Sequence, residues 1–273
     1  YLAVDSGHVY TWRGGALTAG SPTNAGGMVV ARGAHTVDAD LTIPSAMQLT
    51  IDAGASLRFD RALSGAGSLT VAGGGTLSIS NGPAAAVPLM LDGVTFTALA
   101  STTFNADLSL GERGAVVAPS AGTTLTVATP VAGPGGLTKT GSSVLTLAEG
   151  ATFAGELLIR NGTVEMPDEP VGGLTIGEGT FKYTGENAVW PGGYTLRTTE
   201  NWQAATLDTD ADITFSGPIV AEQGAFIKWG SGTLTYSYAG ENQLSAGDNP
   251  GTGRLVLNRG AVGDSPTQGY RSY

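Results

Sequence analysis

The sequence predicts an all-β protein, folded as a right-handed parallel β-helix of about 11 to 13 coils. Three observations predict this fold: short runs of alternating apolar and polar residues, abundant glycine, and motifs that repeat along the chain. Gly occupies 43 of the 273 positions, and charged residues make up only 13%. A globular domain usually has ~25% charged residues. This composition favours short strands joined by tight turns over helices.

The predicted strands each place two apolar side chains on one face, with Thr, Ser or Asp between them. They are Leu41/Ile43, Leu49/Ile51, Leu57/Phe59, Leu69/Val71, Leu77/Ile79, Leu108/Leu110, Leu125/Val127, Leu145/Leu147, Leu157/Ile159 and Leu174/Ile176. Such a strand buries too little to be stable alone or in a hairpin. Coils stacked about 4.8 Å apart would instead form a continuous core. We therefore expect Leu69, Leu77, Leu137 and Leu145 to point inward and to be nearly fully buried.

An antiparallel β-sandwich or barrel is the alternative architecture, because it also contains short alternating strands. Hairpins of this kind are usually closed by Asn-Gly or Asp-Gly turns. Asn-Gly occurs only twice, at Asn81-Gly82 and Asn161-Gly162. The scarcity of hairpin turns favours the β-helix.

Two motifs repeat in phase along the chain. Residues 65–82 read GAGSLTVAGGGTLSISNG, residues 133–150 read GPGGLTKTGSSVLTLAEG, and residues 225–236 form a looser third copy. The second motif reads DADLTI at 38–43, NADLSL at 105–110 and DADITF at 210–215. The sequence therefore predicts repeats of about 67 residues over 31–273. Residues 1–30 are unlike the repeat, and we expect them to form a cap-like N-terminal segment.

The copy at 133–150 resembles the autotransporter-associated β-strand repeat, which runs roughly G-x-G-G-L-x-K-x-G-x-G-x-L-x-L. The following Thr152-Phe-Ala-Gly155 and Ile159-Arg-Asn-Gly-Thr163 extend the similarity. The resemblance implies a passenger segment of a secreted or surface-displayed protein of a Gram-negative-type bacterium, and a repeat without catalytic residues. Lys139 and Lys228 occupy one position of this repeat, where we expect them to pair with acidic residues of adjacent coils.

Composition excludes several classes of function. A net charge of −10 argues against nucleic acid and anionic membrane surfaces as partners. Cys is absent, which excludes disulfides and thiolate chemistry. The longest apolar run, 84–91, has eight residues and contains Pro88, so no segment is long enough to insert into a membrane. His8 and His35 are the only histidines, and no nucleophile, metal or cofactor motif accompanies them.

Aromatic residues are concentrated in the second half of the chain. Ten of the nineteen lie between Phe181 and Tyr238. Exposed Trp and Tyr rings can stack on the apolar faces of sugars, whereas buried rings fill wide parts of a core. The candidate carbohydrate-binding residues are Trp229, Trp202, Trp190 and Tyr194. Trp229 is the foremost of them, because its position in the repeat predicts an outward side chain.

Asp208, Asp210 and Asp212 are a candidate metal site, because their spacing matches the first half of a calcium loop. Ile213 stands where such a loop requires Gly, and Ile219 stands where it requires Glu. A solvated turn that leads into a strand therefore explains the three acids better, and we expect no metal and no cofactor.

The sequence thus favours a structural or adhesive protein, acting as a stalk, adhesin or assembly subunit at the cell surface or outside the cell. A carbohydrate-binding β-helix is the first alternative, and a polysaccharide-degrading β-helix is the second, because paired carboxylates alone can cleave glycosides. Host or matrix glycans or proteins are the expected partners. Residues 255–262 remain repeat-like near the C-terminus. We therefore expect end-to-end self-association or continuation into further repeats.

Overall fold

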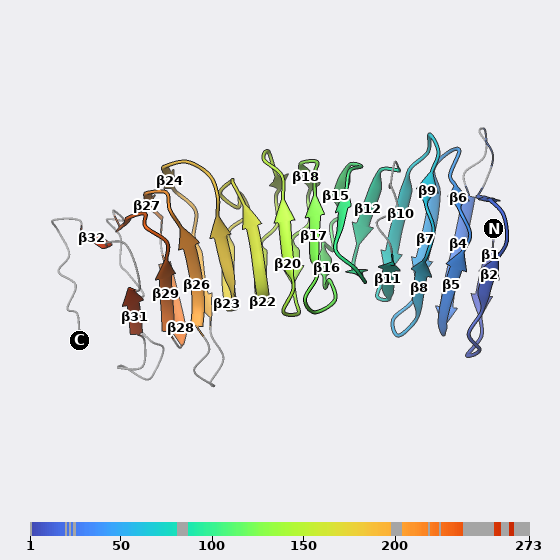
Figure 1. Ribbon diagram of the computed structural model, residues 1–273, viewed down its shortest axis with the longest axis horizontal. Helices are drawn as coiled ribbons and strands as arrows, with labels where there is room; N and C mark the ends of the chain where they lie inside the picture. The colour runs from blue at the N-terminus through green and yellow to red at the C-terminus, as the bar shows by residue number, and fades with distance from the viewer. Residues whose placement is uncertain are drawn as a thin grey trace. The chain divides into compact units, whose positions relative to one another are not determined.

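The computed structural model describes residues 2–19, 21, 23, 26–80, 87–197, 204–217, 219–223, 225–236, 254–257 and 262–264. Their strands pair in parallel and stack as a β-solenoid, which confirms the all-β parallel fold (Figure 1). The described residues make about nine turns, fewer than the 11 to 13 predicted. That prediction divided the whole chain by the length of a coil, whereas the described residues are fewer. No described segment forms a helix long and apolar enough to cross a membrane.

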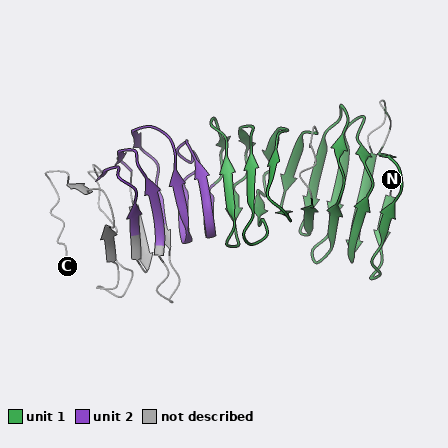
Figure 2. Cartoon of the chain, in the orientation of Figure 1, with its two compact units in different colours: residues 1–155 green, residues 156–273 purple. Residues whose placement is uncertain are grey.

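The chain divides into two compact units, residues 1–155 and residues 156–273 (Figure 2). In unit 1 each coil contributes strands to up to three ladders. The first ladder contains β1 (Leu2–Asp5), β4 (Gly26–Arg32), β7 (Met47–Ile51), β10 (Leu69–Gly73), β12 (Leu89–Asp92), β15 (Leu108–Leu110), β18 (Val131–Gly133) and β21 (Thr152–Phe153). The second contains β2 (Thr11–Arg13), β5 (Ala34–Asp38), β8 (Ser56–Phe59), β11 (Thr76–Ile79), β13 (Val94–Ala98), β16 (Ala115–Val117) and β19 (Leu137–Lys139).

Where a coil of unit 1 has a third described strand, that strand lies in one of two short ladders. One consists of β3 (Leu17–Thr18), β6 (Leu41–Thr42) and β9 (Leu63–Ser64). The other consists of β14 (Thr102–Phe104), β17 (Thr124–Val127) and β20 (Val144–Leu147). The described part of the segment 1–30, expected to be cap-like, contains β1, β2 and β3, which pair in parallel with the next coil, and the start of β4.

Unit 2 is built on two long strands, β22 (Leu157–Met166) and β23 (Leu174–Tyr183), which pair along most of their length. The first half of β23 pairs with β25 (Tyr194–Arg197), and β25 pairs with β28 (Ile219–Gln223). The second half is continued by β26 (Ala204–Thr209), β29 (Ala225–Trp229) and β31 (Arg254–Leu257). A separate ladder contains β24 (Ala188–Trp190), β27 (Ile213–Phe215), β30 (Leu234–Tyr236) and β32 (Val262–Asp264).

The core consists of inward columns in which an apolar side chain of one coil lies on an apolar side chain of the next. Leu125 pairs with Leu145, for example, and Leu57 pairs with Leu77. The four leucines expected to be buried, Leu69, Leu77, Leu137 and Leu145, are each 1% exposed, which confirms that prediction. Because side chains alternate along a strand, every second residue of these strands faces outward.

The two best copies of the sequence repeat do not lie on the same face of unit 1. Leu69 belongs to β10 in the first ladder, whereas its counterpart Leu137 belongs to β19 in the second. The same local motif can therefore form a strand in either ladder, because both need two inward apolar side chains and a tight corner.

Glycines at the corners of the repeat let the coils approach closely. Gly133 has φ of +125°, and a Cβ atom built on it would lie 2.1 Å from the carbonyl oxygen of Leu110 in the preceding coil. Gly65 has the same relationship to Ile43, at 2.2 Å with φ of +122°. Only Gly combines this backbone conformation with this contact, which explains the first Gly of both copies.

Candidate functional site

The outward face of unit 2 carries two parallel columns of side chains. Strand register places Glu165, Lys182, Asp208 and Trp229 side by side on β22, β23, β26 and β29. Neighbouring strands lie about 4.8 Å apart, so the four side chains form one continuous outer column. The parallel column on the same face contains Thr163, Thr180, Thr206 and Ile227.

Trp229 is the aromatic residue of this outer column, and its side chain is 43% exposed. Its outward position agrees with the sequence prediction. The ring is therefore accessible to a ligand, and the carboxylate of Asp208 occupies the adjacent place in the column. A ring beside a carboxylate can stack on the apolar face of a sugar while the carboxylate accepts hydrogen bonds from its hydroxyl groups.

The other end of the column is an ion pair. Lys182 Nζ donates a hydrogen bond to Glu165 Oε1 at 2.8 Å. This bond to Glu165 raises the pKa of Lys182, and the charges of Asp208 and Asp210 contribute to the increase. Lys182 therefore carries a positive charge on the face that also presents Trp229.

The remaining predicted stacking residues do not lie on this face. Trp190 and Tyr194 are 1% and 3% exposed, so a sugar could not stack on either ring without opening the core. They pack instead against Phe181, Tyr183 and Phe215, with ring centroids 5.0 to 5.9 Å apart. This cluster fills the interior of unit 2. Trp202 lies outside the described residues.

The hydroxyl group of Tyr194, in the buried cluster, has a carboxylate as its hydrogen-bond partner. The Tyr194 hydroxyl donates a hydrogen bond to Glu169, which also accepts one from the Gly192 amide at 3.2 Å. Burial, followed by the contact with Glu169, raises the pKa of Tyr194 well above its ordinary value. The phenol is therefore un-ionised at neutral pH and holds the turn before β25 in place.

Two of the candidate metal ligands already have structural partners. Asp210 Oδ1 accepts hydrogen bonds from the Ser231 amide at 2.7 Å and the Ser231 hydroxyl at 2.9 Å. Asp212 Oδ1 accepts one from the Thr233 amide at 2.6 Å. Both carboxylates cap the turn of the next coil, and no group of three or more potential metal ligands occurs among the described residues. Asp210 and Asp212 therefore act as turn caps.

Buried lysines are a feature that the sequence did not predict. Lys139 and Lys228 are each 0% exposed, so the expected surface pairing with acids of adjacent coils is wrong. Lys139 Nζ donates to the carbonyls of Thr140 and Gly141, both at 2.8 Å. Lys228 Nζ donates to the carbonyls of Thr209 at 3.1 Å and Gly230 at 2.6 Å. Each lysine stands two residues before a Gly, and this shared Lys-x-Gly spacing is the sequence signal that could have identified the buried pair.

The surroundings of the two lysines differ in charge. Burial lowers the pKa of Lys139 to about 8. Burial also lowers the pKa of Lys228, and the nearby Asp210, Asp208 and Asp212 oppose that decrease. The three acids and Lys228 therefore interact electrostatically inside unit 2.

No family model matches the chain, and no curated protein or solved structure matches it. The similarity to the autotransporter-associated repeat therefore rests on the residues of the motif alone.

Proposed function

We propose that this chain is a structural and adhesive segment of a secreted or surface-displayed bacterial protein. The observation that supports this proposal best is the use of polar side chains in the solenoid. Asp210 and Asp212 cap the turns of the following coil, and Arg113 pairs with Asp92 of the preceding one at 2.9 Å. Charged groups that bind neighbouring coils together stabilise a scaffold, which suits a stalk or an assembly subunit.

Within this function, the outer column of unit 2 is the proposed adhesive contact. Trp229 offers an exposed ring, Asp208 offers acceptors, and Lys182 offers a donor on one face. This combination suits a carbohydrate ligand, since sugar rings present apolar C–H faces edged by hydroxyl groups. A glycan of the host or of the surrounding matrix is the proposed partner, and the chain binds it without cleaving it.

The test is glycan binding by the whole chain and by two variants. The wild-type chain is applied to a glycan array and to insoluble polysaccharides. Trp229→Ala is expected to lower the affinity at least tenfold, because it removes the stacking surface. Val189→Ala is the matched control, because Val189 is 63% exposed but lies on β24, in the other ladder. Circular dichroism establishes that both variants fold.

Three outcomes would contradict the proposal. Absence of binding to any glycan removes the carbohydrate partner. Equal binding by wild type and Trp229→Ala removes the outer column as the contact. Release of reducing ends or unsaturated products from a bound polysaccharide would establish a degrading enzyme instead.

A further inference from the structure

The outer column of unit 2 contains a carboxylate that differs from its neighbours in having no structural partner. Strand register places Asp208 between Lys182 and Trp229. Lys182 Nζ bonds to Glu165 on its other side, at 2.8 Å. In the part of the chain that the structure describes, no donor forms a hydrogen bond to the side chain of Asp208. Its oxygens therefore remain available to a ligand.

The nearby lysine in the sequence does not neutralise Asp208 at the surface. Lys228 precedes Trp229, and alternation along the strand turns its side chain to the interior, where it is 0% exposed. Its Nζ donates to the carbonyls of Thr209 and Gly230. The charged part of the outer column thus consists of two acids and one lysine, so the column keeps a net negative charge.

The Trp229 ring and the Asp208 carboxylate lie close enough to bind one cation together. They are neighbours on adjacent strands, which are about 4.8 Å apart. An ammonium group interacts with the face of a Trp ring within about 6 Å of its centroid, and it bonds to a carboxylate at about 2.7 to 2.9 Å. A single ammonium group can satisfy both conditions. Because Trp229 is 43% exposed, such a group can reach the ring from solvent.

Two further outward side chains extend this surface to the size of a sugar ring. Ile227 and Thr206 pair with each other in the parallel column, two residues before Trp229 and Asp208. Two residues along a strand span about 6.6 Å. Strand β29 therefore supplies two apolar side chains, while β26, which lies beside it (Figure 1), supplies a carboxylate and a hydroxyl group. A pyranose ring likewise has an apolar C–H face and a polar edge.

We propose that the glycan bound by the outer column contains unacetylated amino sugars, whose ammonium groups lie between the Trp229 ring and the Asp208 carboxylate. This inference rests on the glycan contact proposed above and adds the charge of the ligand. A neutral sugar could stack on Trp229 but would leave the charge of Asp208 unpaired. A uronic acid would bring a carboxylate beside Asp208, where like charges repel, and the net charge of −10 of the chain adds to that repulsion.

Isothermal titration of the whole chain with three oligosaccharides of equal length tests the proposal. They are built from glucosamine, from N-acetylglucosamine and from galacturonate, and so carry positive, no and negative charge. The wild type is expected to bind the glucosamine oligomer at least tenfold more tightly than the N-acetylated one, and to show no binding of galacturonate. Added salt is expected to weaken binding of the glucosamine oligomer, because it screens the charge of an exposed carboxylate.

Three variants identify the residues responsible. Asp208→Asn keeps the shape of the side chain and removes its charge. It is expected to lower the affinity for the glucosamine oligomer at least tenfold, to about that for the N-acetylated oligomer. Trp229→Ala is expected to weaken binding of both oligomers. Asp52→Asn is the matched control, because Asp52 is exposed in a turn of unit 1 and its substitution changes the net charge equally. This control is expected to retain the preference for glucosamine.

The outcomes separate this inference from the glycan contact itself. Equal or tighter binding of the N-acetylated oligomer, weakened by Trp229→Ala, overturns the selection for amines and leaves the glycan contact in place. A preference for glucosamine that persists in Asp208→Asn overturns the role of the carboxylate. Where Asp208→Asn fails to fold, wild-type affinity for glucosamine that is independent of salt overturns the proposal.

Two outcomes would overturn both proposals together. One is the absence of binding to any glycan. The other is tight binding of a lysine-rich peptide without binding of any oligosaccharide, which would identify a protein as the partner of the outer column.

Discussion

Lys139 Nζ donates a hydrogen bond to the carbonyl oxygen of Gly141, two residues further along the chain, from a side chain with no exposed surface. Lys228 has the same relationship to Gly230. Both glycines have positive φ, +74° and +81°. The lysine thus closes the turn that begins beside it, because its ammonium group donates hydrogen bonds to carbonyl groups of that turn.

The free energy of unfolding is expected to depend on pH through Lys139. Its pKa is about 8 in the folded chain, against 10.5 for the ordinary group. Between these two pH values the unfolded chain binds more protons than the folded chain, so the free energy of unfolding rises as the pH increases from about 8 to 10.5. Below pH 8 the lysine is charged in both states, and the full cost of burying the charge is present. Over this interval the free energy of unfolding of the wild type should increase by up to about 3 kcal/mol relative to that of Lys139→Met.

Urea unfolding at several pH values measures this difference. Lys182→Met is the control, because the pKa of Lys182 is raised by Glu165 and its side chain is 44% exposed. Relative to Lys182→Met, the free energy of unfolding of the wild type should not increase between pH 8 and 10.5. Parallel pH profiles for the wild type and Lys139→Met would refute the role assigned to the buried ammonium group.

Gly135→Ala is expected to destabilise unit 1 by about 1 to 3 kcal/mol, the usual cost of overpacking. A Cβ atom at Gly135 would lie 1.9 Å from the carbonyl oxygen of Gly111, and backbone cannot move aside cheaply. Gly15→Ala is the control, because a Cβ atom there meets nothing within 4 Å. Thermal unfolding compares the two variants, and an equal effect on the melting temperature would show that close coil packing is not the reason for the motif glycine.

Asp212→Ala is expected to cost about 1 kcal/mol, because it leaves the Thr233 amide without its acceptor. EDTA and added calcium are both expected to leave the melting temperature of the wild type unchanged, since Asp210 and Asp212 already accept hydrogen bonds from the next coil. Calorimetry with and without chelator measures this. A melting temperature that falls by many degrees in EDTA would restore the three acids as a metal site.

The sequence predicted the parallel solenoid because alternating pairs such as Leu145/Leu147 leave stacking as the only way to bury them. It also predicted the outward side chain of Trp229, because alternation along a strand assigns the face of every residue. It did not show that Trp190 is buried. Both tryptophans lie in short strands, and only three-dimensional packing places Trp190 between Tyr183 and Phe215.

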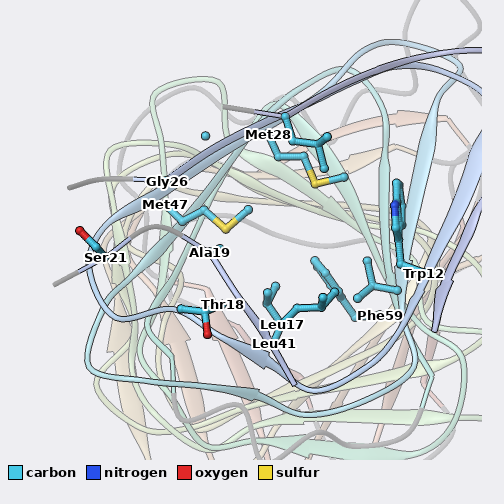
Figure 3. A pocket seen from close by; sticks show the side chains of 13 residues that line it. Trp12, Leu17, Thr18, Ala19, Ser21, Gly26, Met28, Leu41, Met47 and Phe59 are labelled. Carbon is cyan, nitrogen blue, oxygen red and sulfur yellow. The ribbon is translucent and has the colours of Figure 1, made fainter. Parts of the chain in front are cut away.

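The buried lysines and a cavity in unit 1 required the structure for different reasons. A lysine is almost never fully buried unless it is paired, so its type alone predicts a surface position. Lys139 violates that expectation because the turn itself supplies the acceptors. The cavity of unit 1 is lined by Trp12, Met28 and Phe59 among other residues (Figure 3), which lie on strands far apart in the sequence, so only the structure shows that they share one space.

The turn caps between coils give the chain a direction of assembly. In seven of them the acceptor side chain belongs to the earlier coil and the donor amide to the later one: Asp40 to Ala62, Asp92 to Arg113, Ser101 to Thr124, Glu169 to Gly192, Asn187 to Asp212, Asp210 to Ser231 and Asp212 to Thr233. One bond runs the other way, from the Tyr10 amide to His35. A finished coil therefore already displays the oxygen atoms that the next turn needs. A chain that emerges N-terminus first can close coil upon coil, each on a surface prepared for it. A chain that emerges from the other end would offer these amides before the side chains that accept their hydrogen bonds are in place.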